Sequence, residues 1–121
     1  MSKIPVIAVV DDDTAVRAGI DSLIRSLGFM VCLFASAEEF LDSDCLGKAD
    51  CLITDVQMPQ MSGLQLHEHL TAQGMQIPTI FITAFPEESI RRRAMTGSAV
   101  GFLAKPFVAQ VLIDCIESTF I

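Results

Sequence analysis

The sequence predicts an α/β fold in which helices cover both faces of a parallel β-sheet. Short apolar segments rich in β-branched residues recur along the chain, and segments with helical spacing separate them. Several short segments are apolar at every position, which is typical of parallel strands buried on both faces. At 121 residues the chain has the length of one domain, so we expect residues 1–121 to form a single unit.

Five segments have the length and composition of buried strands. They are residues 6–10, 30–34, 51–54, 79–83 and 100–103. Because segments of helical periodicity alternate with them, the expected connections are right-handed crossovers between parallel strands.

Helical spacing marks the segments between the strands. The first helix is expected to begin after Asp13-Thr14. The second begins at Ser36, which caps it with Glu39 at the reciprocal position. A third helix follows Gly63, and a less amphipathic fourth covers residues 90–95. The fifth carries an apolar stripe at Val108, Val111, Leu112, Cys115 and Ile116.

Composition and charge argue against several classes of protein. Hydrophobic residues make up 51% of the chain, but the longest apolar runs are too short to span a bilayer. The N-terminus has no secretory signal pattern, so we expect a cytoplasmic protein without a membrane segment. A net charge of −7 would repel a phosphate backbone, so we expect no direct nucleic-acid binding. The four cysteines are interpreted as buried small apolar residues: Cys32, Cys45, Cys51 and Cys115.

Chemically active residues lie at the ends of the predicted strands. The first strand ends in Asp11-Asp12-Asp13, the third in Thr54-Asp55 and the fourth in Thr83-Ala84, while Lys105-Pro106 follows the fifth. Ligands of such sheets bind at the carboxyl ends of the strands. These side chains are therefore expected to meet at one edge of the sheet.

Three carboxylates close together are expected to bind a cation. Asp11, Asp12 and Asp55 would repel one another unless a proton or a metal ion intervened, and a few oxygen ligands open to water favour Mg²⁺. Asp55 could then act as a nucleophile that forms an acyl phosphate. The Lys105 ammonium would balance charge on the phosphoryl group, and the Thr83 hydroxyl could donate a hydrogen bond to it.

Each of these residues also has a simpler interpretation. Aspartates at strand-to-helix turns often cap helices, and a single aspartate or lysine is often structural or solvated. The joint occurrence of the four features at one sheet edge favours a functional site.

The motifs resemble those of a known family, the chemotaxis-regulator-like receiver (phosphoacceptor) domains of bacterial two-component response regulators. Residues 9–13, Val-Val-Asp-Asp-Asp, resemble the family's acidic strand end, and residues 55–64 resemble its D-x-x-M-P-x-M-x-G segment. Residues 81–84 resemble the switch-threonine strand, and residues 101–107 the F-x-x-K-P-F motif. The resemblance spans essentially the whole chain. It implies a flavodoxin-like (βα)5 fold with strand order 2-1-3-4-5.

The resemblance also implies roles for the acidic residues and their neighbour. Asp55 would be the phosphoacceptor, Asp12 a direct Mg²⁺ ligand and Asp11 a water-mediated one. Gln57 would lend its backbone carbonyl to the metal.

The remaining motif residues would sense the phosphoryl group. Thr83 is similar to the switch hydroxyl, Phe102 to the aromatic side chain that follows it inward, and Lys105 to the phosphate-binding lysine. The resemblance further implies a cis Lys105-Pro106 bond.

For the whole domain, the resemblance implies a signalling function rather than an enzymatic one. A sensor histidine kinase would donate the phosphoryl group, and the only chemistry would be autophosphorylation and autodephosphorylation. The face formed by the fourth helix, fifth strand and fifth helix would then control homodimerisation or an output domain. The motifs resemble those of regulators with a DNA-binding output domain, which favours a transcriptional output.

Two other functions use related features. A Mg²⁺-dependent phosphohydrolase of the haloacid-dehalogenase type also has an aspartyl nucleophile, but it usually needs a second aspartate where this chain has Gln57. A flavin-binding electron carrier shares the fold, but the acidic cluster would repel the flavin phosphate.

Two features are less typical of the family, and a basic run on the fourth helix has two interpretations. Gly101 stands where a charged residue is common, so the fifth strand is expected to be loose. Phe85 is a bulky apolar residue near the mouth of the site, and the run Arg91-Arg92-Arg93 is interpreted as a solvated basic face rather than a partner contact.

Overall fold

A five-stranded parallel sheet forms the centre of the molecule. The computed structural model describes residues 3–120. The strands are β1 (Val6–Val10), β2 (Met30–Phe34), β3 (Cys51–Asp55), β4 (Thr79–Thr83) and β5 (Ala99–Ala104). Their order in the sheet is β2-β1-β3-β4-β5, and all four neighbouring pairs are parallel. The predicted flavodoxin-like order is confirmed.

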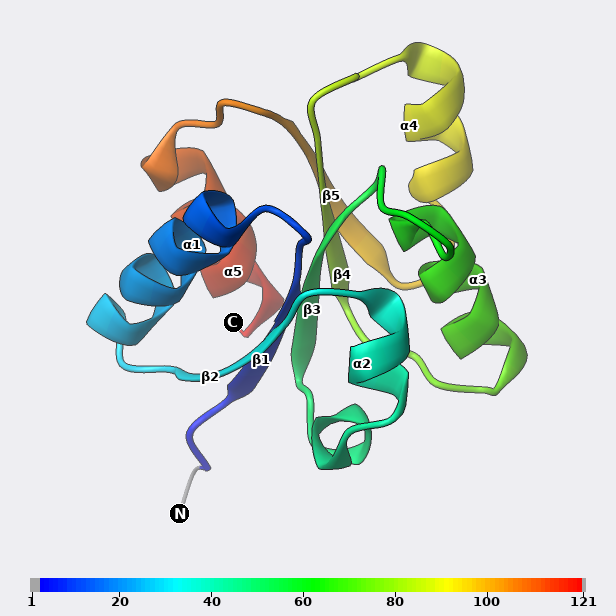
Figure 1. Cartoon of the computed structure of the whole chain (residues 1–121). Coiled ribbons are helices and arrows are strands. Elements are labelled where there is room, and N and C mark those ends of the chain that lie inside the picture. The colour runs from blue at the N-terminus through cyan, green and yellow to red at the C-terminus, as the bar shows by residue number, and fades with distance from the viewer. Residues whose placement is uncertain (1–2, 121) are drawn as a thin grey trace.

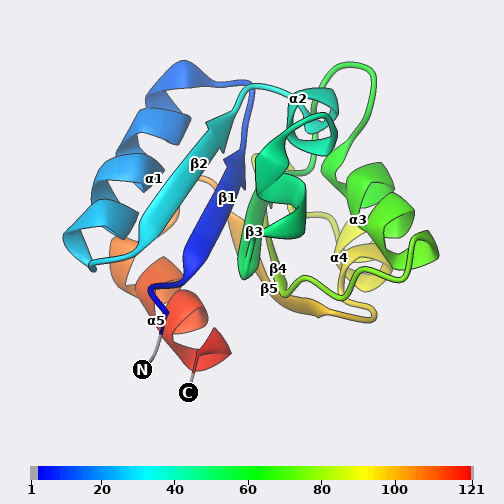
Figure 2. The same cartoon turned by 90° about the horizontal axis from the view of Figure 1, so that it is seen from below.

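Helices connect the strands and cover both faces of the sheet (Figure 1). They are α1 (Thr14–Ser26), α2 (Ala37–Leu41), the 3₁₀-helix η1 (Asp44–Gly47), α3 (Gly63–Ala72), α4 (Glu88–Ala94) and α5 (Ala109–Thr119). Helices α1 and α5 lie on one face, and α2, α3 and α4 lie on the other (Figures 1 and 2). Among residues 3–120, no helix combines the length and the apolar character needed to cross a bilayer.

The core is divided by the sheet because alternate strand residues point to opposite faces. Ile7 and Val9 of β1 pack with Ile20 and Ile24 of α1 and with residues of α5, whereas Val6, Ala8 and Val10 face α2 and α3. Strands β1, β3 and β4 are buried along their whole length, while the edge strands β2 and β5 are partly exposed. The continuous apolar runs therefore mark the central strands, as expected for a parallel sheet.

Side-chain caps begin three of the helices. The Asp13 carboxylate accepts hydrogen bonds from the backbone N–H groups of Ala15 (2.9 Å) and Val16 (3.2 Å). Ser36 caps α2 as predicted, but Glu39 accepts from the N–H of Ala35 rather than closing a reciprocal bond with Ser36. The complete capping box lies instead at the start of α3, which the sequence analysis did not predict.

That capping box joins Ser62 and Gln65. The Ser62 hydroxyl accepts from the N–H of Gln65 at 3.1 Å, and the Gln65 side chain accepts from the N–H of Ser62 at 2.9 Å. The first residue of α3 follows the loop that leaves the end of β3. The capping box therefore holds this residue in a defined position.

The last strand differs from the expectation in its details. The register between β4 and β5 shifts between Thr79 and Ile80, which leaves Val100 as an extra residue. Gly101 is buried, and a Cβ atom there would lie 3.2 Å from Cys115 Sγ and 3.4 Å from Ile80 Cγ2. The shift in register agrees with the expected looseness of β5. Gly101 itself, however, packs closely against Cys115 of α5.

The cysteines are only partly as predicted. Cys45 and Cys51 are buried, but Cys32 and Cys115 are half-buried, and all four are free thiols. Cys32 lies on the edge strand β2 and Cys115 on α5, where it packs at the border of the core.

Candidate functional site

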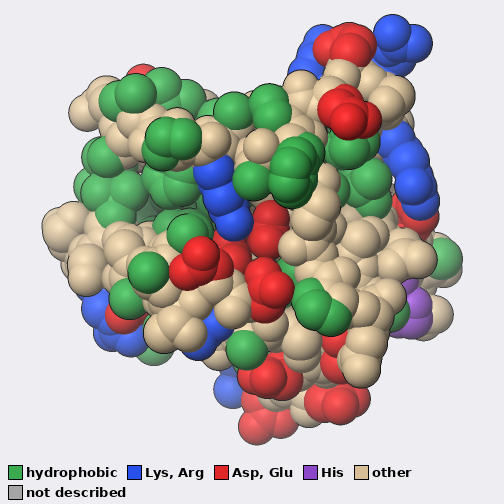
Figure 3. Space-filling view, turned by 45° about the horizontal axis from the view of Figure 1, so that its top comes forward, with side chains coloured by type: hydrophobic (Ala, Val, Ile, Leu, Met, Phe, Trp, Pro, Cys, Tyr) green, Lys and Arg blue, Asp and Glu red, His purple; other side chains and the backbone are tan. Residues whose placement is uncertain are grey.

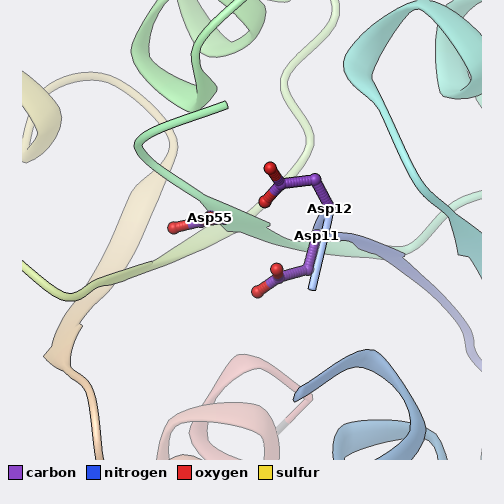
Figure 4. Close-up of side chains that lie close together, drawn as sticks. All are labelled: Asp11, Asp12 and Asp55. Carbon is purple, nitrogen blue, oxygen red and sulfur yellow. The ribbon is translucent and has the colours of Figure 1, made fainter. Parts of the chain in front are cut away.

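The predicted acidic residues meet at the carboxyl ends of β1 and β3. Asp11 and Asp12 directly follow β1, and Asp55 is the last residue of the neighbouring strand β3. One carboxylate oxygen from each side chain lies within 4.8 Å of the other two. Figure 4 shows the three side chains projecting from adjacent strand ends into the same region.

The three carboxylates have different environments. Asp11 and Asp55 are buried, with 1% and 5% of their surface exposed, and Asp12 is exposed. Asp11 Oδ1 accepts a hydrogen bond from the N–H of Asp13 at 2.8 Å, and the buried Asp11 Oδ2 atom has only the Lys105 ammonium as an ion-pair partner. Three carboxylates with a single ammonium group between them keep an excess of negative charge, which fits a hard divalent cation.

Asp13 takes no part in this cluster. Its carboxylate caps α1, so the simpler interpretation of the acidic run holds for this residue. The run Asp11-Asp12-Asp13 thus contains both a helix cap and two candidate metal ligands.

Lys105 extends from the end of β5 to the acidic cluster. Its Nζ atom lies 3.1 Å from Asp11 Oδ2 and 3.4 Å from Asp55 Oδ1. Its backbone N–H donates to the carbonyl of Thr83 at 2.8 Å, and the Lys105-Pro106 bond is cis. Burial would lower the pKa of the ammonium group, but the Asp11 and Asp55 carboxylates outweigh burial and raise it above its ordinary value.

The Asp55 carboxyl group is shifted toward its neutral form. Burial is the main cause, the negative charge of Asp11 adds to it, and Lys105 opposes it, so that the pKa rises to about 6. Asp12 contributes a smaller effect in the same direction as Asp11. Positive charge delivered to this site would therefore lower the pKa and favour the carboxylate, which is the nucleophilic form.

Gly63 makes room for the backbone of Asp55. A Cβ atom at Gly63 would collide with the Asp55 carbonyl oxygen and would lie 3.0 Å from its carbonyl carbon. The N–H of Gly63 donates to the carbonyl of Val56 at 2.9 Å. The glycine is thus required by this close approach of α3 to β3 and not by a positive φ angle.

Thr83 is buried, and its hydroxyl group has partners that the sequence analysis missed. Thr83 Oγ1 donates to Gln57 Oε1 at 2.6 Å and accepts from the N–H of Phe85 at 3.0 Å. Gln57 is therefore linked to the site through its side chain, while its backbone carbonyl stays a predicted metal ligand. The sequence feature that could have suggested this hydrogen bond is the polar residue two positions after Asp55.

Arg17 is another contributor that sequence reasoning did not identify. Its Nη1 atom donates to the backbone carbonyl of Asp11 at 2.6 Å. Arg17 lies on the first turn of α1, four residues after the cap Asp13, so its position could have suggested a contact with the acidic loop.

Phe102 lies on the same side of the sheet as Thr83. Ala104 is the register partner of Thr83, and Phe102, two residues earlier, is the partner of Phe81. The Phe102 ring is half-buried against a cluster formed by Val56, Leu64, Phe81 and Ala94. Thr83 and Phe102 therefore lie in the same layer between the sheet and its helices, so a displacement of Thr83 could affect the packing of the Phe102 ring.

The arginine run on α4 makes surface ion pairs. Arg93 forms a double hydrogen bond with Glu68 of α3 at 3.0 Å for each, and Arg91 and Arg92 lie near Glu88. These pairs agree with a solvated basic face and contribute little to stability.

Comparison with known proteins identifies the family. Residues 7–117 match the model of the response regulator receiver domain. Response regulator protein TodT of Pseudomonas putida is 41% identical over 113 residues, which are 93% of this chain and 50% of TodT. Transcriptional regulatory protein FixJ of Bradyrhizobium diazoefficiens is 38% identical over 112 residues, which are 93% of this chain and 55% of FixJ.

A solved structure agrees with these relatives. The response regulator StyR has a TM-score of 0.88 and 44% sequence identity, over 97% of this chain and 59% of the StyR chain. The chain belongs to the response regulator receiver domain family. It spans about half the length of the curated relatives that it matches.

Proposed function

We propose that the chain accepts a phosphoryl group on Asp55 from the phosphohistidine of a sensor histidine kinase and changes its surface in response. The observation that carries the proposal is the grouping of Asp11, Asp12 and Asp55 within 4.8 Å, with the Lys105 ammonium 3.4 Å from Asp55. This arrangement combines a carboxylate nucleophile, a place for a divalent cation and a fixed positive charge. Phosphoryl transfer needs mainly positioning and charge balance.

In the proposed reaction, a carboxylate oxygen of Asp55 attacks the phosphorus atom. A P–O bond forms as the P–N bond to the histidine breaks, and the histidine nitrogen keeps the electron pair. Lys105 exchanges part of its contact with Asp55 for a phosphoryl oxygen, and the Thr83 hydroxyl leaves Gln57 to donate to another. Asp11, Asp12 and the Gln57 carbonyl would hold Mg²⁺, which supplies charge neutralisation at the phosphoryl oxygens.

The same geometry disfavours a phosphohydrolase. Such an enzyme would need an acid near the leaving group, whereas the side chain two positions after Asp55 is Gln57, which accepts a hydrogen bond from Thr83. An amide cannot serve as the general acid for a leaving group. We therefore place the chain among phosphoacceptors.

A groove beside the site supports docking of a helical partner. The groove has a volume of about 740 Å³ and lies between α1 and the segment that follows β5. Its lining is mostly apolar and includes Val16, Ile20, Leu23, Pro106 and Phe107, and Lys105 borders it. Figure 3 shows apolar side chains gathered beside the central acidic group. A kinase helix in this groove would bring its phosphohistidine next to Asp55.

The proposed output surface is formed by α4, β5 and α5. Its exposed apolar side chains are Met95, Val100, Val108 and Val111. Phosphorylation at Asp55 would act on this surface through Thr83 and Phe102, and the surface would then mediate homodimerisation or contact an output domain. The name of the relative FixJ, a transcriptional regulatory protein, supports a transcriptional output.

Phosphorylation by a small donor tests the proposal directly. Incubation with acetyl phosphate and Mg²⁺ is expected to add the mass of one phosphoryl group, and Asp55→Asn is expected to abolish this gain. Intact-mass spectrometry measures both. Removal of Mg²⁺ with a chelator should also stop the reaction. An equal gain of base-labile phosphate in Asp55→Asn would exclude Asp55 as the acceptor.

The metal assignment has a matched control within the acidic run. Asp12→Ala is expected to weaken Mg²⁺ binding at least tenfold, since it removes a proposed ligand. Asp13→Ala removes only the α1 cap and should leave the affinity nearly unchanged, at a stability cost of about 1 kcal/mol. Equal losses of affinity in the two variants, measured by calorimetry, would contradict the assignment.

A further inference from the structure

The hydroxyl group of Thr83 is occupied by two partners from the chain itself. Thr83 is 0% exposed, and its Oγ1 atom accepts from the N–H of Phe85 at 3.0 Å and donates to Gln57 Oε1 at 2.6 Å. A hydroxyl group has one proton, so it donates one hydrogen bond at a time. The Gln57 side chain and a phosphoryl oxygen on Asp55 would therefore compete for the same proton.

The pairing of β3 with β4 brings Gln57 to this position. Asp55 is the register partner of Ile82, and the N–H of Val56 donates to the Ile82 carbonyl at 3.0 Å. The pairing thus continues one residue beyond the end of β3, and Gln57 leaves the sheet beside Thr83, the last residue of β4. Although the two residues are 26 positions apart in the sequence, the fold fixes them as neighbours.

Burial makes the hydrogen bond between Gln57 and Thr83 costly to lose. Thr83 is buried and Gln57 is half-buried, so water has little access to the Thr83 hydroxyl group. A buried donor that loses its acceptor without a replacement keeps the full cost of its desolvation. Thr83 can leave Gln57 at low cost only when another acceptor takes its proton. A phosphoryl oxygen on Asp55 would be such an acceptor, and its charge would strengthen the new bond.

We propose that Gln57 is a positioning residue whose side chain holds Thr83 in its unphosphorylated orientation and so sets the equilibrium of the switch. The inference rests on the proposed function, because it concerns the regulation of the same site. The hydrogen bond exists only in the unphosphorylated state, since Thr83 must break it to reach the phosphoryl group. A contact that is present in only one of two states shifts the equilibrium toward that state.

The expected size of this shift follows from the net stability of one hydrogen bond. An intramolecular hydrogen bond typically changes an equilibrium constant by about two- to tenfold. Loss of the Gln57 acceptor is therefore expected to favour the switched state by about this factor. Phe102 lies in the same layer as Thr83 and is half-buried, so its ring should report the change.

Titration with beryllofluoride, which mimics the aspartyl phosphate in the presence of Mg²⁺, measures the equilibrium. Gln57→Met keeps the length of the side chain but offers only a weak sulfur acceptor. We expect it to bind beryllofluoride about two- to tenfold more tightly than the parent, with the bound fraction measured by fluorine NMR. Gln60→Met is the matched control, because Gln60 is an exposed glutamine of the same loop, and it should keep the affinity of the parent.

A double-mutant cycle shows whether the effect passes through Thr83. Thr83→Ala removes the hydroxyl group, so adding Gln57→Met to this variant should leave its affinity for beryllofluoride unchanged. A purely structural role of Gln57 in the loop would instead change the affinity equally in both backgrounds. The metal-free chain gives a second readout. There, the NMR signals of Phe102 in Gln57→Met should move toward the positions that beryllofluoride produces in the parent.

Two results would overturn the role of Gln57. One is an affinity of Gln57→Met for beryllofluoride that is equal to or weaker than that of the parent. The other is an equal change of affinity with and without the Thr83 hydroxyl group. In both cases the parent would still accept phosphate on Asp55, so the proposed function would stand. If the parent neither binds beryllofluoride nor gains phosphate, the proposed function is wrong and the role of Gln57 fails with it.

Discussion

At the residue scale, Asp55 combines a strand-end position with an environment that disfavours its charge. Its pKa of about 6 exceeds the ordinary value of 3.8, because burial and Asp11 outweigh Lys105. The folded chain thus binds this proton more tightly than the unfolded chain. The resulting stability is fully present below about pH 4 and is lost as the pH rises through about 6.

This linkage predicts that Asp55→Asn stabilises the chain in the absence of divalent metal. At pH 7 the variant is expected to raise the free energy of unfolding by on the order of 1–3 kcal/mol, since it removes a buried charge. The difference should shrink toward zero as the pH falls from 7 to 4. Urea denaturation at several pH values, in the presence of a chelator, measures it. If the variant is no more stable than the parent at pH 7, the charge of Asp55 does not lower the free energy of unfolding.

Phe85 gives a second prediction at this scale, on the lifetime of the phosphorylated state. Its side chain is 61% exposed, while its N–H donates to Thr83 Oγ1, so its backbone is held beside the predicted switch residue. We expect the ring to shield the phosphoryl group from the attacking water. Phe85→Ser should hydrolyse the acyl phosphate several-fold faster, whereas Phe85→Leu, which keeps an apolar side chain, should resemble the parent.

Decay of the phosphorylated species after removal of the donor can be followed by intact mass. A decay in Phe85→Ser that is as slow as in the parent would rule out shielding by the ring.

At the element scale, the contact between the start of α3 and the end of β3 positions the site. The capping box of Ser62 and Gln65 holds the first turn of α3, and Gly63 lets this turn approach the Asp55 carbonyl. The start of α3 therefore ends the loop that follows β3 and also supports Asp55, the residue that we propose as the phosphoacceptor.

Gly63→Ala should reveal this contact. The added Cβ atom meets backbone rather than a flexible side chain, so we expect a destabilisation of about 3 kcal/mol and slower phosphorylation of Asp55. Gly19→Ala is the matched control, because Gly19 lies within α1 and a Cβ atom there meets nothing within 4 Å. That substitution should stabilise the chain by about 0.5–1 kcal/mol.

Thermal and urea denaturation compare the two glycine variants under the same conditions. The opposite signs are the essential result, since helix propensity alone favours alanine at both positions. Stabilisation by Gly63→Ala would mean that α3 can move away from β3 without cost.

At the scale of the whole molecule, the site and the proposed output surface are connected through the β4–β5 half of the sheet. Thr83 ends β4, and Phe102 lies on the same face of β5, packed toward α4. A bound phosphoryl group adds negative charge that would attract the Thr83 hydroxyl and Lys105. Phe102 could then enter the vacated space, and a bias of a few kcal/mol would be sufficient to exchange two surface states.

Beryllofluoride with Mg²⁺ mimics the aspartyl phosphate and tests this connection. We expect it to promote dimerisation, or to shift the NMR signals of β5 around Phe102, and we expect Thr83→Ala to lose this response while Asp55 still accepts phosphate. Thr79→Ala is the control, because Thr79 is a buried threonine at the other end of β4 whose hydroxyl donates to the Ile77 carbonyl. Sedimentation velocity and NMR measure the two readouts. An unchanged response in Thr83→Ala would exclude the relay.

The architecture could be predicted from the sequence, and so could the meeting of four charged strand-end residues at one edge of the sheet. The continuous apolar runs identified the central strands, and the polar residues at their ends identified Asp11, Asp12, Asp55 and Lys105. Such local patterns are legible because burial on both faces of a parallel sheet and exposure at the strand ends place strong demands on residue type.

The partner of each side chain became known from the packing of the folded chain. This packing separated Asp13, a helix cap, from its two neighbours, joined Gln57 to Thr83, and placed Arg17 on the Asp11 carbonyl. It also showed that Gly63 is needed for a close approach of backbones. These contacts depend on how separate elements pack, and a one-dimensional pattern does not contain the distances and directions that select one hydrogen-bond partner among several.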